Sequence, residues 1–196
     1  MARDACAVVL AGGGSRRFGS DKALALFRGE PLVGRVARTL REAGFTQVAI
    51  AAKEPEKYAA AAAGTELLTD VRPAQTPLAG LEAALRGSRH PLVFACAADM
   101  PFAADAALID ALTAAIAGHD AAVPHAGGAL QPLCALWRRD PCLRIAEELL
   151  AAPRPVGPRE ILPRVRAAKL DWADIRPFLD ADTPEVLREL ELGAKG

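Results

Sequence analysis

Short apolar runs alternate with amphipathic stretches along the chain. The run Ala5–Leu10 is apolar throughout and leads into glycines, which is typical of a strand buried on both faces of a sheet. Further strands are expected at Val48–Ala52, Glu66–Thr69, Pro91–Ala97, Ala121–Pro124 and Leu133–Trp137.

Between these runs, apolar residues recur at helical spacing. The segment Pro31–Ala43 carries Leu32, Val36 and Leu40 on one face, with proline suited to the first turn and Gly44 after the last. Further helices are expected at Tyr58–Ala63, Leu78–Leu85, Ala104–Ala117, Cys142–Ala151 and Glu185–Leu192.

The alternation of strands and helices predicts an α/β fold, with a mostly parallel sheet flanked by helices and right-handed crossovers. We therefore expect a single-domain, Rossmann-like three-layer sandwich over residues 1–196. A chain of this length can bury a core without disulfides or a structural metal. The residues after the Pro-rich stretch Pro153–Pro163 are too few to fold alone, so this stretch is expected to be a surface loop.

Acidic and basic residues balance at 24 each, so no overall basic field favours nucleic acid or a membrane surface. The expected partner is a small molecule. The amino-terminal stretch lacks the regions of a signal peptide, and no apolar run reaches the roughly 18–20 residues that span a bilayer. These features predict a cytoplasmic protein.

Other candidate ligands and charges favour ordinary structural roles. The four cysteines include no CxxC pair and are expected to be buried free thiols, and the three histidines have no ligand-like spacing. A set of basic residues near the carboxyl end could meet an anionic phosphate, but a solvated face is the preferred interpretation. The cysteines are Cys6, Cys96, Cys134 and Cys142; the histidines are His90, His119 and His125; the basic set is Arg154, Arg159, Arg164, Arg166 and Lys169.

The most informative stretch is Leu10–Lys22, with the sequence LAGGGSRRFGSDK. Three consecutive glycines allow a sharp turn and present bare backbone N–H groups to an anion. The arginines that follow can bind the oxygens of a polyphosphate through their planar guanidinium groups, and Lys22 can bind them as a point charge. The stretch therefore predicts a phosphate-binding loop, in which Leu10, Ala11, Gly12, Gly13, Gly14, Ser15, Arg17 and Lys22 contact a nucleotide.

Two common nucleotide motifs do not fit this loop. The dinucleotide fingerprint GxGxxG that starts at Gly12 would require glycine where Arg17 stands. The Walker pattern nearly fits Gly14 to Gly19, but two residues intervene before Lys22. The loop is therefore of a third type.

Two aspartates, Asp99 at a strand end and Asp182 before the final helix, add candidate chemistry. Asp99 follows an apolar strand at the carboxyl end, where ligands bind in open α/β sheets, and Mg²⁺ prefers one or two carboxylates together with phosphates and waters. Asp99 is therefore the expected Mg²⁺ ligand, with capping of the next helix as the alternative, a role that Asp105 could fill. Asp182 is a candidate second metal ligand or the N-cap of the final helix.

The loop LAGGGSRRFGSDK resembles the signature LAGGxSxRMGxxDK of the molybdenum cofactor guanylyltransferases, which have a nucleotide-diphospho-sugar-transferase-like fold. Phe18 stands where the family has Met. The resemblance continues in the same order over almost the whole chain, at Thr76–Leu81 (TPLAGL), Cys96–Phe102 (CAADMPF), Gln131–Leu136 (QPLCAL) and Asp182–Leu187 (DTPEVL).

This resemblance implies an enzyme that transfers GMP from GTP to the terminal phosphate of molybdopterin and releases pyrophosphate, with Mg²⁺ as cofactor. It implies that Asp99 holds the metal and that Asp70, at the end of the third expected strand, contacts the nucleotide. An Asx turn is the plain structural alternative for Asp70. The chain departs from the family at Asp182, where Asn is frequent. It also lacks the Asn that the family often carries just after the second strand, where this chain has Ala51–Lys53. Lys53 is expected to be a solvated lysine.

From the residues, Arg17, Lys22 and Asp99 are the expected catalytic groups, acting by positioning and charge neutralisation. One alternative is a cytidylyltransferase that acts on the same cofactor or on a sugar-alcohol phosphate, although LAGG rather than LAAG favours GTP. Another is a non-catalytic nucleotide-binding module. Cofactor-delivery proteins are possible partners, and the expected state is a monomer or a weak homo-oligomer.

Overall fold

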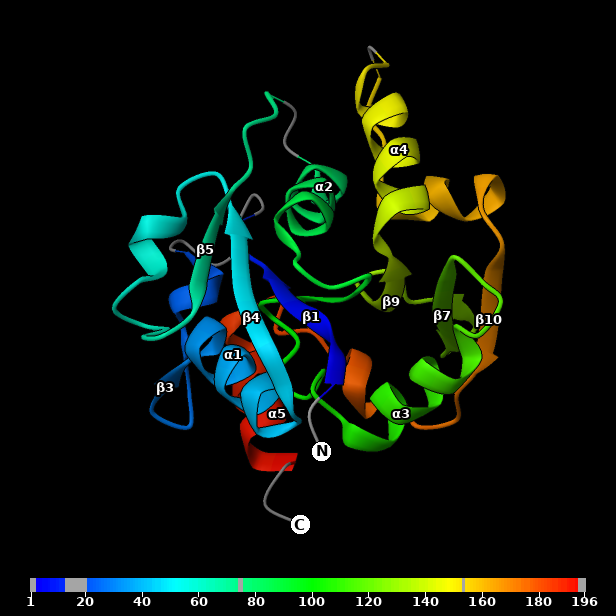
Figure 1. Ribbon diagram of the computed structural model, residues 1–196. Coiled ribbons are helices and arrows are strands. Elements are labelled where there is room, and N and C mark those ends of the chain that lie inside the picture. The colour runs from blue at the N-terminus through cyan, green and yellow to red at the C-terminus, as the bar shows by residue number, and fades with distance from the viewer. Residues whose placement is uncertain (1–2, 13–20, 74–75, 153, 194–196) are drawn as a thin grey trace.

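The computed structural model describes residues 3–12, 21–73, 76–152 and 154–193 (Figure 1). Its main sheet has the strand order β10-β7-β9-β6-β1-β4-β5, with β8 beside β7. The strands are β1 (Arg3–Leu10), β4 (Phe45–Ala52), β5 (Glu66–Thr69), β6 (Leu92–Ala97), β7 (Ala121–Ala126), β8 (Ala129–Leu130), β9 (Cys134–Arg138) and β10 (Ala167–Asp171). A separate hairpin joins β2 (Leu26–Phe27) to β3 (Glu30–Pro31).

The central strands β5, β4, β1 and β6 pair in parallel, whereas β9 runs antiparallel to both β6 and β7. The carboxyl ends of the four parallel strands therefore meet at one edge of the sheet. In open α/β sheets, this is the edge that binds ligands.

Helices cover both faces of the sheet. Figure 1 shows α2 (Pro77–Gly87) and α4 (Arg139–Leu150) on one side, and α1 (Leu32–Glu42), α3 (Ala106–Ala115) and α5 (Pro184–Gly193) on the other. Alternate residues of β1 enter the two cores: Val9 packs in the core with α1 and α3, and Val8 in the core with α2 and α4. Both side chains are fully buried, as predicted from the continuous apolar run.

The structure confirms the predicted α/β class, the single domain and the mostly parallel sheet. The four cysteines are buried and free, and burial raises the pKa of Cys6 and Cys142 to about 12. Among the described residues, no helix is both long and apolar enough to cross a membrane.

Two local predictions are wrong. The helix expected at Tyr58–Ala63 is instead a 3₁₀ turn, η2 (Pro55–Tyr58), followed by irregular turns up to Gly64. Six residues are too few to offset helix nucleation without an amphipathic face to bury. Most of the 3₁₀ helix η3 (Pro158–Arg164) lies within the expected surface loop Pro153–Pro163, and its residue Ile161 is fully buried in the core shared with α2 and α4.

The turns after η2 pack tightly against α1. Gly34 lies where a Cβ atom would come within 2.1 Å of the carbonyl oxygen of Ala61, so only glycine allows this approach. Tyr58 is fully buried beside α1, in the same core as Val33. This packing fixes the position of η2, whose residues Lys57 and Tyr58 contact Asp21 at the end of the predicted phosphate loop.

Candidate active site

The amino-terminal end of the predicted phosphate loop is held between two strands. The N–H of Ala11 donates to the carbonyl of Ala51 over 2.9 Å, and the N–H of Ala98 donates to the carbonyl of Leu10 over 3.0 Å. Gly12 has a φ of +107°, a conformation that favours glycine, and apart from its chain neighbours no atom of the described residues lies within 4 Å of the position of its missing Cβ.

The rest of the predicted loop cannot be placed. Gly13, Gly14, Ser15 and Arg17 lie outside the described residues. Their roles stay predictions from the sequence.

The chain is described again from Asp21, which begins a short 3₁₀ helix, η1 (Lys22–Leu24). The Asp21 carboxylate accepts a hydrogen bond from the N–H of Ala23 over 3.1 Å, which caps η1. Its other oxygen accepts one from the hydroxyl of Tyr58 over 2.8 Å and pairs with Lys57 over 2.8 Å. These contacts anchor the turn that carries Lys22.

Lys22 bridges two of the predicted metal ligands. Its ammonium forms an ion pair with Asp99 Oδ2 and another with Asp182 Oδ1, the second over 2.8 Å. Asp99 is mostly buried, with 17% of its side chain exposed, whereas Asp182 is 54% exposed. The backbone joins the two aspartates, because the N–H of Ala181 donates to the carbonyl of Asp99 over 2.9 Å.

The charge on Lys22 follows from these contacts. Burial alone would lower its pKa, but the hydrogen bonds to Asp182 and Asp99 and the charges of these carboxylates prevail and raise it. The amine is therefore an ammonium ion, and one positive charge lies between two carboxylates. A divalent cation could occupy the same position, since the same oxygens face it.

A third carboxylate, Asp180, was not among the predicted site residues. Although the residue as a whole is exposed, partial burial of its carboxyl raises its pKa, and the neighbouring charges of Asp182 and Asp99 add to this. The spacing of Asp180 and Asp182 along the chain was the available signal. Within the described ranges, no group of three or more His, Cys, Asp or Glu side chains could hold a metal ion. Asp99 and Asp182 would therefore need oxygens from a ligand or from water to complete a coordination shell.

Capping does not account for either Asp99 or Asp182. The cap of α3 is Asp105, whose Oδ1 accepts a hydrogen bond from the N–H of Leu108 over 2.7 Å. The first turn of α5 is satisfied by the hydroxyl of Thr183, which accepts from the N–H of Val186 over 3.3 Å. Both carboxylates are thus available at the edge of the sheet.

Asp70 belongs to a second group at the same carboxyl edge of the sheet, after the edge strand β5. Its Oδ1 accepts a hydrogen bond from the N–H of Arg72 over 2.9 Å, which is an Asx turn, and its Oδ2 lies 3.4 Å from Lys53 Nζ. Lys53 is exposed, in line with the expected solvated lysine, and its ammonium also donates to the carbonyl of Arg72. Both side chains of this Asp70–Lys53 group are thus held by contacts with the segment that follows β5.

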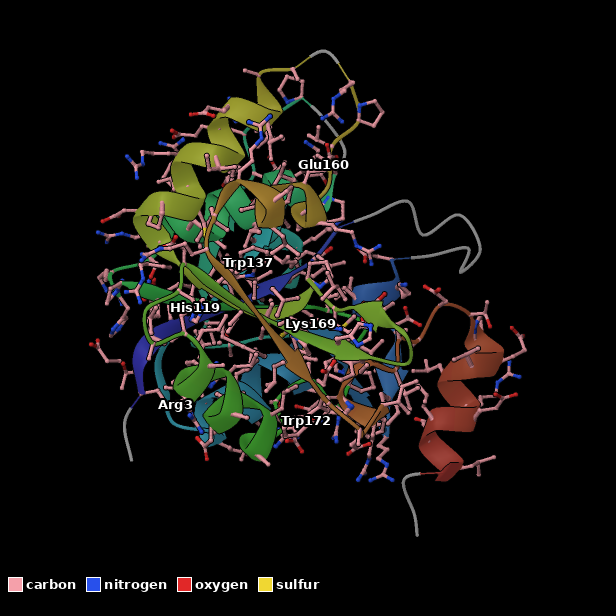
Figure 2. The ribbon with its side chains drawn as sticks, turned by 90° about the vertical axis from the view of Figure 1, so that its right-hand side faces the viewer. Arg3, His119, Trp137, Glu160, Lys169 and Trp172 are labelled. Atoms are coloured by element: carbon pink, nitrogen blue, oxygen red, sulfur yellow. The ribbon has the colours of Figure 1, made fainter. Side chains whose placement is uncertain are left out.

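The basic residues near the carboxyl end are largely neutralised. Figure 2 shows Lys169 on β10, Trp172 just after that strand and Glu160 within η3. Four of the five basic side chains pair with carboxylates, as Arg154 does with Glu160 over 2.6 Å. This pattern agrees with a solvated face.

The phosphate-loop strand, the lysine and the strand-end carboxylates define a nucleotidyltransferase-type α/β domain. Residues 7–169 match the family described as the MobA-like NTP transferase domain. The chain belongs to that family, and with it to the nucleotidyltransferases.

The sequences of several relatives match this chain over nearly its whole length. It is 34% identical over 178 residues to the "Probable molybdenum cofactor guanylyltransferase" of Pelotomaculum thermopropionicum, which covers 91% of this chain and 84% of the relative. It is 34% identical over 197 residues to the molybdenum cofactor guanylyltransferase of Desulfosudis oleivorans, which covers 96% and 95%. The crystal structure of molybdopterin-guanine dinucleotide biosynthesis protein A from Archaeoglobus fulgidus superimposes with a TM-score of 0.77 at 21% identity, over 96% of this chain and 97% of that one.

Proposed function

We propose that this protein transfers GMP from GTP to the terminal phosphate of molybdopterin and releases pyrophosphate, with Mg²⁺ as the cofactor. The observation that carries the proposal is the cluster of Lys22, Asp99 and Asp182, which lies beyond the carboxyl end of β6, the strand that pairs with β1 before the predicted phosphate loop. The relatives named molybdenum cofactor guanylyltransferase support the choice of substrates.

In this reaction, an oxygen of the acceptor phosphate attacks the α-phosphorus of GTP in line. A new P–O bond forms as the bond to the β-phosphate oxygen breaks, and pyrophosphate carries away the electron pair. No covalent intermediate with the protein is needed. The protein contributes positioning and charge neutralisation.

Each group has a role in that scheme. The backbone of Leu10, Ala11, Gly12, Gly13, Gly14 and Ser15 would cradle the phosphates. Arg17 and Lys22 would stabilise the charge of the triphosphate, while Asp99 and Asp182 would hold Mg²⁺, which neutralises negative charge on the phosphates. The donor set fits this ion, because it offers two carboxylates and leaves the remaining positions to phosphate and water.

The Asp70–Lys53 group would face the nucleoside. Asp70 is 9% exposed and keeps one oxygen near Lys53. The Lys53 ammonium has three N–H donors, of which the carbonyl of Arg72 takes one. The ammonium is suited to the O6 and N7 acceptors of guanine, as lysine is in other guanine contacts.

The test is pyrophosphate release with purified protein, molybdopterin and each of GTP, CTP, ATP and UTP, with and without Mg²⁺. We expect release with GTP that depends on both Mg²⁺ and the acceptor. Thermal shifts should agree, because a nucleotide at 100 times its Kd stabilises the fold by about 2.7 kcal/mol. Preferred use of CTP would replace this proposal with the cytidylyl reaction, and absence of turnover with every nucleotide would leave a binding module.

A further inference from the structure

A cavity of about 220 Å³ lies away from the Lys22 cluster, between α1 and the segments that follow β6 and β10. Two arginines line it, Arg35 from α1 and Arg176 from the short 3₁₀ helix η4 (Arg176–Phe178). Its wall also includes Thr39, Phe102, Asp105 and Asp174. We call it the Arg35–Arg176 pocket.

Two aromatic rings hold the two guanidinium groups in place. The Arg35 guanidinium lies over the ring of Phe27, with its Cζ 5.0 Å from the centroid, and that of Arg176 lies over Phe102 at 4.7 Å. Phe27 and Phe102 pack edge to face, with centroids 5.7 Å apart. The two planar forks are therefore preorganised, and a ligand would lose little entropy in ordering them.

The donors of these two guanidinium groups have no partner among the described residues. Neither guanidinium donates a hydrogen bond to a described residue or pairs with a described carboxylate, and Arg35 Nε is buried without a partner. Arg38, one turn further along α1, differs because it pairs with both Glu30 and Glu42. An unsatisfied buried donor requires an explanation, and a bound anion is one.

The electrostatic state of Arg35 fits the same explanation. Burial lowers its pKa, and the nearby charge of Arg38 lowers it further, yet a guanidinium stays protonated in proteins. Arg35 is thus a partly desolvated cation that forms no direct ion pair with a described carboxylate, although the charges of Glu30 and Glu42 partly offset these effects. An anion in the pocket would relieve that cost.

The two carboxylates of the pocket are partly committed to the backbone. Asp105 accepts from the N–H of Leu108 over 2.7 Å, and Asp174 accepts from the N–H of Arg176 over 2.9 Å. Each keeps a second oxygen, which could accept from a hydroxyl group. The pocket thus combines fixed donors for an anion with acceptors for hydroxyls.

We infer that the Arg35–Arg176 pocket is a binding site for a small phosphate monoester, separate from the strand-end site. Paired arginine forks match phosphate oxygens, and the free carboxylate oxygens suit the hydroxyls of a short carbon chain. The volume lies below the roughly 300–1,000 Å³ of sites for drug-sized ligands, so a whole nucleotide is disfavoured.

The pocket also contacts the loop that carries Asp99. Phe102 follows Asp99 by three residues and packs in a small core with Phe27 and Ala181, whose N–H donates to the carbonyl of Asp99. A ligand in the pocket would therefore stabilise the backbone on which Asp99 and Asp182 are placed.

The test is isothermal titration calorimetry of the full chain with glycerol 3-phosphate and, in a second arm, inorganic phosphate. Binding is measured in Lys22→Ala protein, in which the strand-end site is weakened. We expect both anions to bind, the monoester more tightly. Adding Arg176→Gln or Arg35→Gln should weaken both by roughly tenfold or more, since each removes a charged fork.

Two further variants sharpen the result. Arg188→Gln, at an exposed residue of α5, should leave both affinities unchanged, and Arg35→Lys should recover part of the affinity because it restores the charge without the fork. Circular dichroism checks folding, and if Arg35→Gln fails to fold, Arg176→Gln at an exposed residue decides the question. No binding, or equal affinities in the Arg176→Gln and Arg188→Gln proteins, would overturn the inference.

Discussion

Lys22 and Asp182 lie 160 positions apart in the chain, yet the ammonium of one contacts the carboxylate of the other over 2.8 Å. The same ammonium contacts Asp99, so one lysine connects the start of the domain, its central strand β6 and the segment before α5. If Mg²⁺ binds as proposed, Lys22 would compete with it for the same oxygens in the absence of nucleotide. A triphosphate would draw the lysine away and leave the carboxylates to the metal.

Replacement of Lys22 by Ala should therefore change two quantities in opposite directions. Turnover with GTP should fall by at least roughly tenfold, because charge that faces the triphosphate is lost. The affinity of the nucleotide-free protein for Mg²⁺ should rise, because the competing ammonium is gone. Calorimetric titration with Mg²⁺ and a pyrophosphate-release assay measure the two effects. Lys169→Ala, which removes a lysine paired with Asp171 at the sheet edge, is the control and should change neither.

The Asp99→Asn variant should fold normally, because Asp105 rather than Asp99 caps α3. The substitution keeps size but removes the negative charge that a hard cation requires. We expect a higher Mg²⁺ concentration at half-maximal rate and a lower maximal rate, with partial recovery at high Mg²⁺. Initial rates across a Mg²⁺ titration give both values, with Asp171→Asn as the matched exposed carboxylate. A half-saturation point equal to that of the wild type would remove Asp99 from the metal site.

The free energy of unfolding should depend on pH through Glu82, a carboxylate on α2 whose side chain is only 2% exposed. Burial alone would raise its pKa, but hydrogen bonds from Arg72 and Arg86 prevail and hold the pKa below its ordinary value. A depressed folded-state pKa contributes stability that is present above the unfolded pKa of about 4.3 and is lost as the pH falls through the folded value.

Glu82→Gln should therefore destabilise the protein by roughly 1–3 kcal/mol at neutral pH. The difference from the wild type should shrink as the pH falls below about 4. Urea unfolding at several pH values measures it. Glu147→Gln, which removes the more exposed carboxylate paired with Arg86, should cost much less. A difference that does not depend on pH would contradict the assignment of the ion pair.

Gly34→Ala should destabilise the fold, since the new Cβ would lie 2.1 Å from the carbonyl oxygen of Ala61 and the backbone would have to shift. Overpacking of this kind costs roughly 1–3 kcal/mol. Gly157→Ala is the control, because its Cβ would meet nothing within 4 Å. Thermal melts of the two variants make the comparison. Equal melting temperatures would show that η2 and its following turns can move away from α1.

The central strands β1, β4 and β6 were predictable because they are buried on both faces. A short continuous apolar run such as Ala5–Leu10 is typical of a strand in the middle of a parallel sheet, so its structure can be predicted from sequence. The wrong helix at Tyr58–Ala63 arose where an alanine-rich composition suggested a helix, whereas tertiary contacts decided otherwise. Tyr58 is held by Asp21 from a distant part of the chain, and no local pattern encodes that contact.

The candidate site was predictable in part for the same reason. Lys22 and Asp99 stand beside strand ends, so topology brings them to one edge of the sheet. The approach of Asp182 depends on the backbone hydrogen bond between Ala181 and Asp99, and the roles of Lys53 and Asp180 depend on side-chain contacts. These contacts depend on how distant segments pack together, and the spacing of apolar residues along the chain does not predict that packing.

The bridge from Lys22 to Asp182 also sets the order in which the site can form during synthesis. Ribosomes deliver the chain from its amino terminus, and Lys22 and Asp99 emerge well before Asp182. A nascent chain that has already paired β1 with β6 still lacks the second carboxylate. The site is therefore completed only after residue 182 has left the ribosome, and a chain that stops earlier presents the phosphate loop without its full set of charges.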